Sequence, residues 1–129
     1  MVRPHLLLID DEPALATFVA SAAQECDYHP AVATDEGDFR RRYGEQRPDV
    51  VVLDLGMPGM DGVELLRFLS EEKFRGPVLI ISGFDRRVLD SAFRLGKALG
   101  LTMVGPLEKP TRLEELETIL REVRPVVPR

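Results

Sequence analysis

The chain has 129 residues, 44% of them hydrophobic and 30% charged, which fits one globular domain. Its net charge of −5 argues against direct nucleic-acid binding, and the basic run Arg40-Arg41-Arg42 is typical of a solvated helix face. No apolar run approaches the roughly 18 residues that span a membrane, and the N-terminal residues do not resemble a signal peptide. A single cysteine, Cys26, excludes an internal disulfide, so we expect a cytoplasmic protein without membrane contact.

The first half of the chain alternates strand-like runs with amphipathic segments. Residues 5–9 are a continuous apolar run of strand length. Apolar residues repeat at helical spacing over 15–22, and Pro13 falls where a first helical turn tolerates proline. A weaker strand is predicted at 30–33. The segment 35–45 is the least regular helix candidate, because it holds a glycine and many charges.

The same alternation continues in the second half. Continuous apolar runs predict strands at 50–53 and 78–81, as in a parallel sheet covered on both faces. A helix with apolar residues at 65–69 is expected between them. The next helix has an apolar stripe formed by Val88, Ala92, Leu95 and Leu99.

The last predicted strand covers 102–104, and Thr111 with Glu114 predicts a capping box before the last helix. Five strand–helix alternations imply right-handed crossovers and a parallel sheet with helices on both faces. We assign residues 1–124 to one domain. Residues 125–129 contain two prolines and are interpreted as a tail or the start of a linker.

Polar residues gather at the predicted carboxyl ends of the strands, where ligands bind in open parallel sheets. Asp10 and Asp11 follow the first strand, Asp54 ends the third, Ser82 ends the fourth, and Lys109 follows the fifth. Crowded carboxylates repel unless one is protonated or a cation lies among them, and oxygen ligands suit Mg²⁺. Since a carboxylate is a nucleophile and the other groups can hold an anion, the set fits phosphoryl transfer onto Asp54.

Each of these residues also has an ordinary structural interpretation. The acidic run could cap the following helix, Ser82 could lie in a turn, and Lys109 could simply precede a helix. Asp54 is harder to explain in this way, because it follows four apolar residues and a buried unpartnered charge is expensive. The coincidence of all of them at matching strand ends favours a functional site.

Four motifs carry a family resemblance: residues 8–12 (LIDDE), 51–62 (VVLDLGMPGMDG), 80–83 (IISG) and 108–110 (EKP). With them the sequence resembles the receiver domains of two-component response regulators, such as the chemotaxis regulator, over residues 5–123. The resemblance implies a flavodoxin-like, doubly wound α/β fold. Its five-stranded parallel sheet would have the order 2-1-3-4-5, with five helices.

The resemblance also implies a phosphoacceptor and a metal site. Asp54 would accept the phosphoryl group. Asp11 and Asp54 would bind Mg²⁺ directly, Asp10 would do so largely through water, and the backbone carbonyl of Gly56 would complete the protein ligands.

Two further residues would hold the phosphoryl group. Ser82 would bind one of its oxygens and shift when the group arrives. Lys109 would pair with Asp54 or with the phosphoryl group, aimed by a cis peptide bond before Pro110. Gly83 would keep the approach to Asp54 open.

The sequence departs from the family pattern in two places. Receivers commonly carry Tyr or Phe three residues before the lysine, where the ring moves during activation, and Pro106 occupies that position here. The stretch between Ser82 and Lys109 is also longer than in the chemotaxis regulator, which predicts a lengthened fourth helix around 85–100. The sequences of residues 82–87 (SGFDRR) and 105–110 (GPLEKP) are similar to those of receivers joined to EAL-type cyclic-di-GMP phosphodiesterase domains.

These features lead to one main hypothesis and two alternatives. The main hypothesis is a switch that a sensor histidine kinase or phosphotransfer protein phosphorylates on Asp54. The phosphorylated domain would then engage a downstream protein or an attached output domain. A homodimer is compatible with this hypothesis. Such a domain catalyses only its own phosphorylation and dephosphorylation. One alternative is a degenerate receiver that acts by protein contact alone. The other is a phosphohydrolase with Asp54 as nucleophile, although the haloacid-dehalogenase type would need an aspartate where Gly56 lies.

Overall fold

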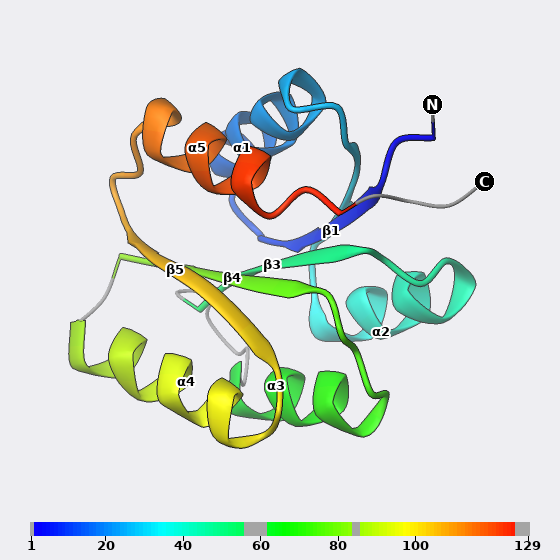
Figure 1. The fold of residues 1–129 in the computed structure, drawn as a ribbon, viewed down its shortest axis with the longest axis vertical. Coiled ribbons are helices and arrows are strands. Elements are labelled where there is room, and N and C mark those ends of the chain that lie inside the picture. The colour runs from blue at the N-terminus through cyan, green and yellow to red at the C-terminus, as the bar shows by residue number, and fades with distance from the viewer. Residues whose placement is uncertain (1, 56–61, 84–85, 126–129) are drawn as a thin grey trace.

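The computed structural model describes residues 2–55, 62–83 and 86–125, in which strands and helices alternate (Figure 1). The strands are β1 (His5–Ile9), β2 (His29–Ala33), β3 (Val50–Asp54), β4 (Pro77–Ser82) and β5 (Thr102–Glu108). The helices are α1 (Pro13–Glu25), α2 (Glu36–Glu45), α3 (Gly62–Glu71), α4 (Arg86–Ala98) and α5 (Leu113–Glu122). No helix in these ranges is long and apolar enough to cross a bilayer.

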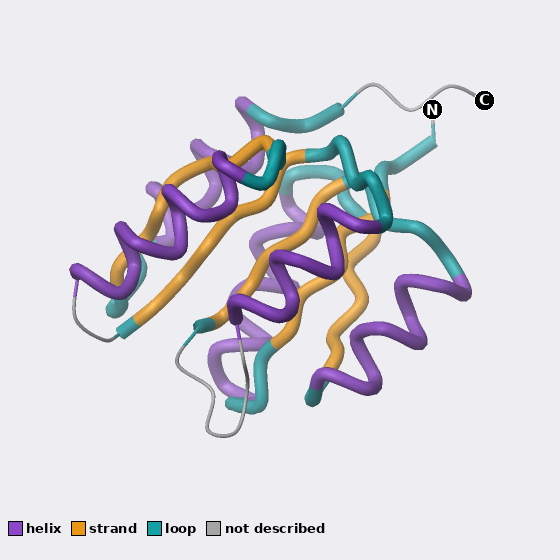
Figure 2. Tube along the Cα trace, turned by 90° about the horizontal axis from the view of Figure 1, so that it is seen from below, coloured by secondary structure: helices purple, strands orange, loops and turns teal. Residues whose placement is uncertain are grey.

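The strands form one parallel sheet in the order β2-β1-β3-β4-β5, which confirms the predicted topology. Helices α1 and α5 cover one face, and α2, α3 and α4 cover the other (Figures 1 and 2). Each face has its own apolar core. Because the central strands are buried on both faces, their sequences are continuously apolar rather than alternating.

Helix starts only partly follow the sequence predictions. Asp35 caps α2, and its side chain accepts the Asp38 N–H at 2.7 Å. The capping box predicted for α5 is wrong: the helix begins at Leu113, and the Thr111 hydroxyl donates to the Glu108 carbonyl at 3.3 Å instead. Thr111 lies too far before the first helical turn to reach its free N–H groups.

The apolar stripe predicted for α4 is also partly wrong. Val88 is 53% exposed, whereas Leu89 and Gly96 are buried. The helix is rotated from the predicted stripe because Gly96 packs directly against Met103 of β5, with no room for a Cβ atom between them. A glycine carries no apolar signal, so the periodicity of side chains could not reveal this contact.

Strand β5 contains a bulge beside the carboxyl end of the sheet. Leu79 of β4 pairs with Val104, but Ile81 pairs with Leu107, so β5 has one extra residue between these two pairs. The bulge includes Gly105, whose φ of +86° and close approach to Leu79 (2.7 Å from a Cβ to Leu79 Cδ1) both require glycine. As a result Leu107 points to the α1–α5 face, where it packs in the core.

Both outer edges of the sheet are protected from pairing with another strand. The His29 N–H and the Ala33 carbonyl form hydrogen bonds on the β1 side of β2. The backbone of Pro30 therefore faces the outer edge, and proline has no N–H group to donate to another strand. Just after β2, the Thr34 N–H donates a hydrogen bond to the Asp38 side chain at 3.4 Å. The bulge interrupts the opposite edge, on β5. These features are typical of edges that avoid intermolecular sheet formation.

Candidate functional site

Asp54 and Lys109 form a buried ion pair at the carboxyl edge of the sheet. Asp54 is the last residue of the central strand β3 and is 2% exposed. Its Oδ2 accepts a hydrogen bond from Lys109 Nζ at 3.0 Å. The lysine side chain reaches the carboxylate from beyond the end of β5 and remains 23% exposed. A buried carboxylate is therefore held beside one cation that solvent still reaches.

Asp10 is a second buried carboxyl group beside this pair. It follows β1, is 1% exposed, and its Oδ1 accepts the Glu12 N–H at 2.9 Å. Its buried Oδ2 has no hydrogen-bond partner among the described residues. Burial raises the pKa of Asp10 from 3.8 to about 6, and the negative charge of Asp54 adds to this increase. The two carboxyl groups thus have more negative charge than Lys109 alone balances near neutral pH.

Ser82 and Gly83 fix the position of the lysine. Ser82 ends β4 and is fully buried, and its carbonyl accepts the Lys109 backbone N–H at 2.9 Å. A Cβ atom on Gly83 would lie 3.2 Å from Lys109 Cδ, so glycine leaves room for the lysine side chain. The peptide bond between Lys109 and Pro110 is cis, as the family resemblance implied.

The predicted metal ligands are only partly assembled. Asp10 and Asp54 lie together, but Asp11 is exposed, and Gly56 lies outside the described residues. Within residues 2–55, 62–83 and 86–125, no group of three His, Cys, Asp or Glu side chains is arranged to hold a metal ion. The unpartnered Asp10 oxygen and the excess negative charge still fit a hard divalent cation, and an all-oxygen donor set fits Mg²⁺.

The structure adds polar residues that the sequence did not single out. Glu12 Oε2 lies 4.0 Å from Lys109 Nζ, so a third carboxylate faces the same ammonium group. Glu108 forms an ion pair with Arg86 at the start of α4, 2.5 Å between Oε1 and Nη1. No sequence pattern indicates this second contact, because it depends on the bulge in β5.

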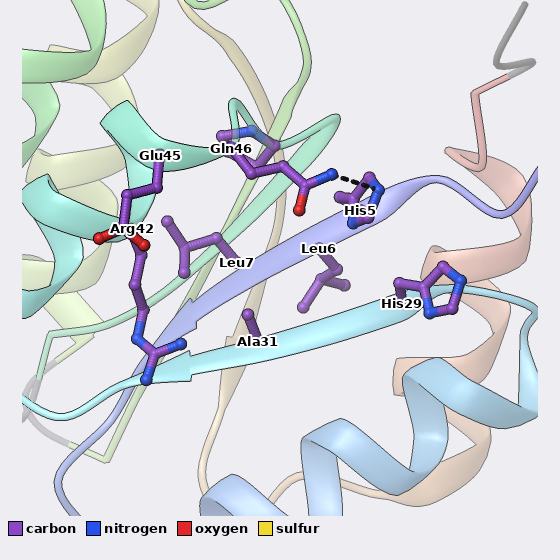
Figure 3. Close-up of a pocket in the computed structure, with 9 residues that line it drawn as sticks. His5, Leu6, Leu7, His29, Ala31, Arg42, Glu45 and Gln46 are labelled. Atoms are coloured by element: carbon purple, nitrogen blue, oxygen red, sulfur yellow. Dashed lines mark hydrogen bonds between the residues drawn. The ribbon is translucent and has the colours of Figure 1, made fainter.

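A pocket of about 310 Å³ lies at the opposite, amino end of the sheet (Figure 3). His5 and His29, the two histidines of the chain, pair in register there with their rings stacked 5.4 Å apart. His5 Nε2 lies 2.8 Å from the amide nitrogen of Gln46 at the end of α2. Because the acidic residues and Lys109 lie at the other end of the strands, the histidines take no part in that site.

The basic run on α2 is paired with acidic side chains. Arg41 contacts Asp38 and Glu45 at 2.5 and 2.6 Å, and Arg42 contacts Asp38 at 3.1 Å. Arg40 lies over the ring of Phe68, 4.7 Å from its centroid. These interactions support the interpretation of the run as a solvated helix face.

The fold and the site together define a class of protein: a doubly wound α/β domain with its polar site where the central parallel strands end. The sequence matches the response regulator receiver domain over residues 6–121, and the chain belongs to this family. It is therefore a receiver domain of two-component signalling, a family that acts as a signalling switch and for which phosphorylation on aspartate is implied.

Relatives and solved structures agree with this assignment. The chain is 36% identical to the transcriptional regulatory protein TrcR of Mycobacterium tuberculosis, over 91% of this chain and 44% of that protein. It is 28% identical to the chemotaxis protein CheY of Listeria monocytogenes, over 87% and 94% of the two chains. The structure of CheY4 of Vibrio cholerae superposes with a TM-score of 0.75 at 27% identity, covering 94% of this chain and 98% of that one.

The match to the larger regulators is partial. The chain spans 44% of TrcR, 47% of the probable regulator TcrX and 35% of a protein-glutamate methylesterase of Burkholderia thailandensis. The similarity is thus to a part of each of these proteins.

Proposed function

We propose that this receiver domain accepts a phosphoryl group on Asp54 from a sensor histidine kinase or a phosphotransfer protein. The observation that supports this most directly is the buried Asp54 carboxylate, which lies 3.0 Å from Lys109 and beside Asp10, a second buried carboxyl group with a raised pKa. The phosphorylated domain would then engage a downstream protein or an attached output domain in the cytoplasm. It would turn over no external substrate.

In the proposed reaction an Asp54 oxygen forms a bond to phosphorus while the bond from phosphorus to the donor's histidine nitrogen breaks. The donor leaves as neutral imidazole after taking up a proton, and Asp54 becomes an acyl phosphate. Lys109 neutralises part of the charge on the transferred group, and the buried Ser82 hydroxyl would hold one of its oxygens. Attack by water on the acyl phosphate returns Asp54 and inorganic phosphate.

Mg²⁺ would be held by Asp10, Asp11, Asp54 and the Gly56 carbonyl, with Asp10 acting largely through water. When bound, the ion would neutralise charge on the phosphoryl oxygens. The high pKa of Asp10 supports this proposal, because a nearby cation would allow both buried carboxyl groups to ionise.

The test is intact-mass analysis after incubation with phosphoramidate or acetyl phosphate, with and without Mg²⁺. We expect wild type to gain one phosphoryl mass only with Mg²⁺, and Asp54→Asn to gain none. Asp27→Asn is a matched control, because Asp27 is exposed and its positive φ of 65° suits asparagine. No gain in wild type, together with no binding of fluoroberyllate, would contradict the proposal.

That negative result would favour a receiver that acts by protein contact alone. The exposed Asp11 and the Pro106 that replaces the usual aromatic residue are the observations in its favour. Steady release of phosphate from a phosphate ester, dependent on Asp54, would instead indicate a phosphohydrolase. Homodimerisation, if it occurs, would use helix faces, because both sheet edges are protected.

A further inference from the structure

The ion pair between Arg86 and Glu108 joins the start of α4 to the end of β5. Arg86 Nη1 lies 2.5 Å from Glu108 Oε1, and Arg86 Nε lies 3.9 Å from Asp90 one turn along α4. The side chains of Arg86 and Glu108 remain 72% and 47% exposed, so solvent screens their attraction. An exposed pair of this kind favours one position of the helix start only weakly, so it can be reversed.

The bulge in β5 is what directs Glu108 towards α4. Side chains alternate along a strand, so an uninterrupted β5 would place Leu107 on the same face as Met103, which packs towards α4. The extra residue at the bulge instead places Leu107 in the opposite core, and Glu108 then points to the α4 side. The Gly105–Pro106 sequence thus replaces the usual aromatic residue with a different contact between β5 and α4.

The same strand end is coupled directly to the phosphorylation site. Glu108 pairs in register with Ser82, and the next residue, Lys109, bonds both to the Ser82 carbonyl at 2.9 Å and to Asp54 at 3.0 Å. A phosphoryl group on Asp54 would draw the lysine ammonium and the serine hydroxyl towards its oxygens. Glu108 lies one residue before Lys109, so a shift of this strand end would also move the Glu108 carboxylate.

Helix α4 is held differently at its two ends. Its second half packs on β5 where the Met103 side chain lies directly against the backbone of Gly96. Its first turn carries the exposed Arg86, Arg87 and Val88, followed by Leu89, which is 1% exposed and packs in the core. Release of Arg86 would therefore let the exposed residues before Leu89 move, while Leu89 and the second half of the helix act as the fixed point.

We propose that the Arg86–Glu108 ion pair is a latch that holds the first turn of α4 in the unphosphorylated state and loosens when Asp54 is phosphorylated. This inference rests on the proposed phosphorylation of Asp54. By linkage, a contact that phosphorylation weakens must also oppose phosphorylation, so removal of the pair favours the phosphorylated form.

The experiment uses the full chain with fluoroberyllate and Mg²⁺ as a stand-in for the phosphoryl group. The variants are Arg86→Gln, Glu108→Gln and the charge swap Arg86→Glu with Glu108→Arg. Arg41→Gln is the control, since it removes two short ion pairs that both lie within α2. We expect each single variant to bind fluoroberyllate about two- to fivefold more tightly, as the loss of an exposed ion pair allows. The charge swap should return the affinity to within about twofold of wild type, a result that a purely structural role would not give.

Amide hydrogen exchange without ligand gives a second, independent readout. The single variants should exchange faster than wild type at residues 90–92, whose N–H groups bond to the carbonyls of the first turn of α4, with no change in the turn that contains Gly96. Three results would each overturn the latch. The single variants could show unchanged exchange at the start of α4, they could bind fluoroberyllate no more tightly than wild type, or the charge swap could fail to restore the wild-type affinity. Failure of wild type to bind fluoroberyllate would count against the proposed function itself, and the exchange data would still decide whether the pair holds α4.

Discussion

The two ends of the parallel sheet hold titratable side chains in opposite ways. At the carboxyl end, Asp10 and Asp54 are 1% and 2% exposed and share one ammonium group. At the amino end, His5 is half-buried and His29 is exposed, and their stacked rings line a pocket (Figure 3). Burial of like charges is unfavourable, and a fold retains it where a reaction or ligand needs it. The unfavourable electrostatics of Asp10 and Asp54 are therefore the better guide to the functional end of the sheet.

The largest expected effect concerns the cation at the carboxyl end. Lys109→Met removes the partner that lies 3.0 Å from Asp54, so the rate of phosphorylation by phosphoramidate should fall about 10²- to 10³-fold. A mass-spectrometric time course measures it. Lys97→Met is the control, because Lys97 lies over the ring of Phe93 on α4, away from the site. A decrease of less than about tenfold would show that Lys109 is not needed for the transfer.

The next prediction concerns the cost of the second buried carboxyl group. The folded protein keeps the Asp10 proton up to about pH 6, whereas the unfolded chain loses it near 3.8. The Asp10 contribution to stability therefore falls as pH rises from about 4 to about 6 and stays low above that. At pH 8 with chelator, Asp10→Asn should raise the free energy of unfolding by about 2–3 kcal/mol, which is the cost of a shift of about two pKa units.

Urea denaturation at pH 4 and pH 8 measures this effect. The exposed neighbour gives the control, because Asp11→Asn should leave the stability of the metal-free protein nearly unchanged. If Asp10→Asn is neutral or destabilising at pH 8, the burial of the ionised Asp10 carboxylate does not destabilise the fold as the structure indicates.

Alanine substitutions at two glycines compare how tightly the backbone is constrained in two regions of the molecule. Gly105→Ala near the carboxyl end should destabilise the fold by about 1–2 kcal/mol, because φ is +86° and the added Cβ would press on Leu79. Gly44→Ala in α2 should instead stabilise by up to about 1 kcal/mol, because open space surrounds that position in a helix. Chemical denaturation distinguishes the two, and equal effects would show that the bulge is not constrained.

The smallest effects are expected at the amino end. His5→Ala and His29→Ala should each cost less than about 1 kcal/mol, since they remove one partly exposed ring stack. Phosphorylation of Asp54 should stay within about twofold of wild type. A larger loss of phosphorylation would break the contrast between the two ends and connect the histidine pocket to the site.

The site residues were predictable to different extents. Asp54 and Ser82 could be placed from the sequence because each directly follows a continuous apolar run, which fixes both the strand and its end. Lys109 was placed less exactly, because the apolar run before it ends at Val104 whereas the strand continues through the bulge to Glu108. The different environments of Asp10, which is buried, and Asp11, which is exposed, were not predictable, since both lie beyond the end of β1, where the alternation of a strand no longer applies.

The sequence by itself determined the order and type of the elements, the parallel sheet and the edge at which its polar residues gather. These follow from the period of apolar residues, which is a local property of the chain. Only the tertiary structure decided that Gly96 packs on Met103, that Thr111 caps no helix, and that the bulge turns Glu108 towards Arg86. Such contacts depend on how closely two elements approach and in which register, and residues distant in the chain set both.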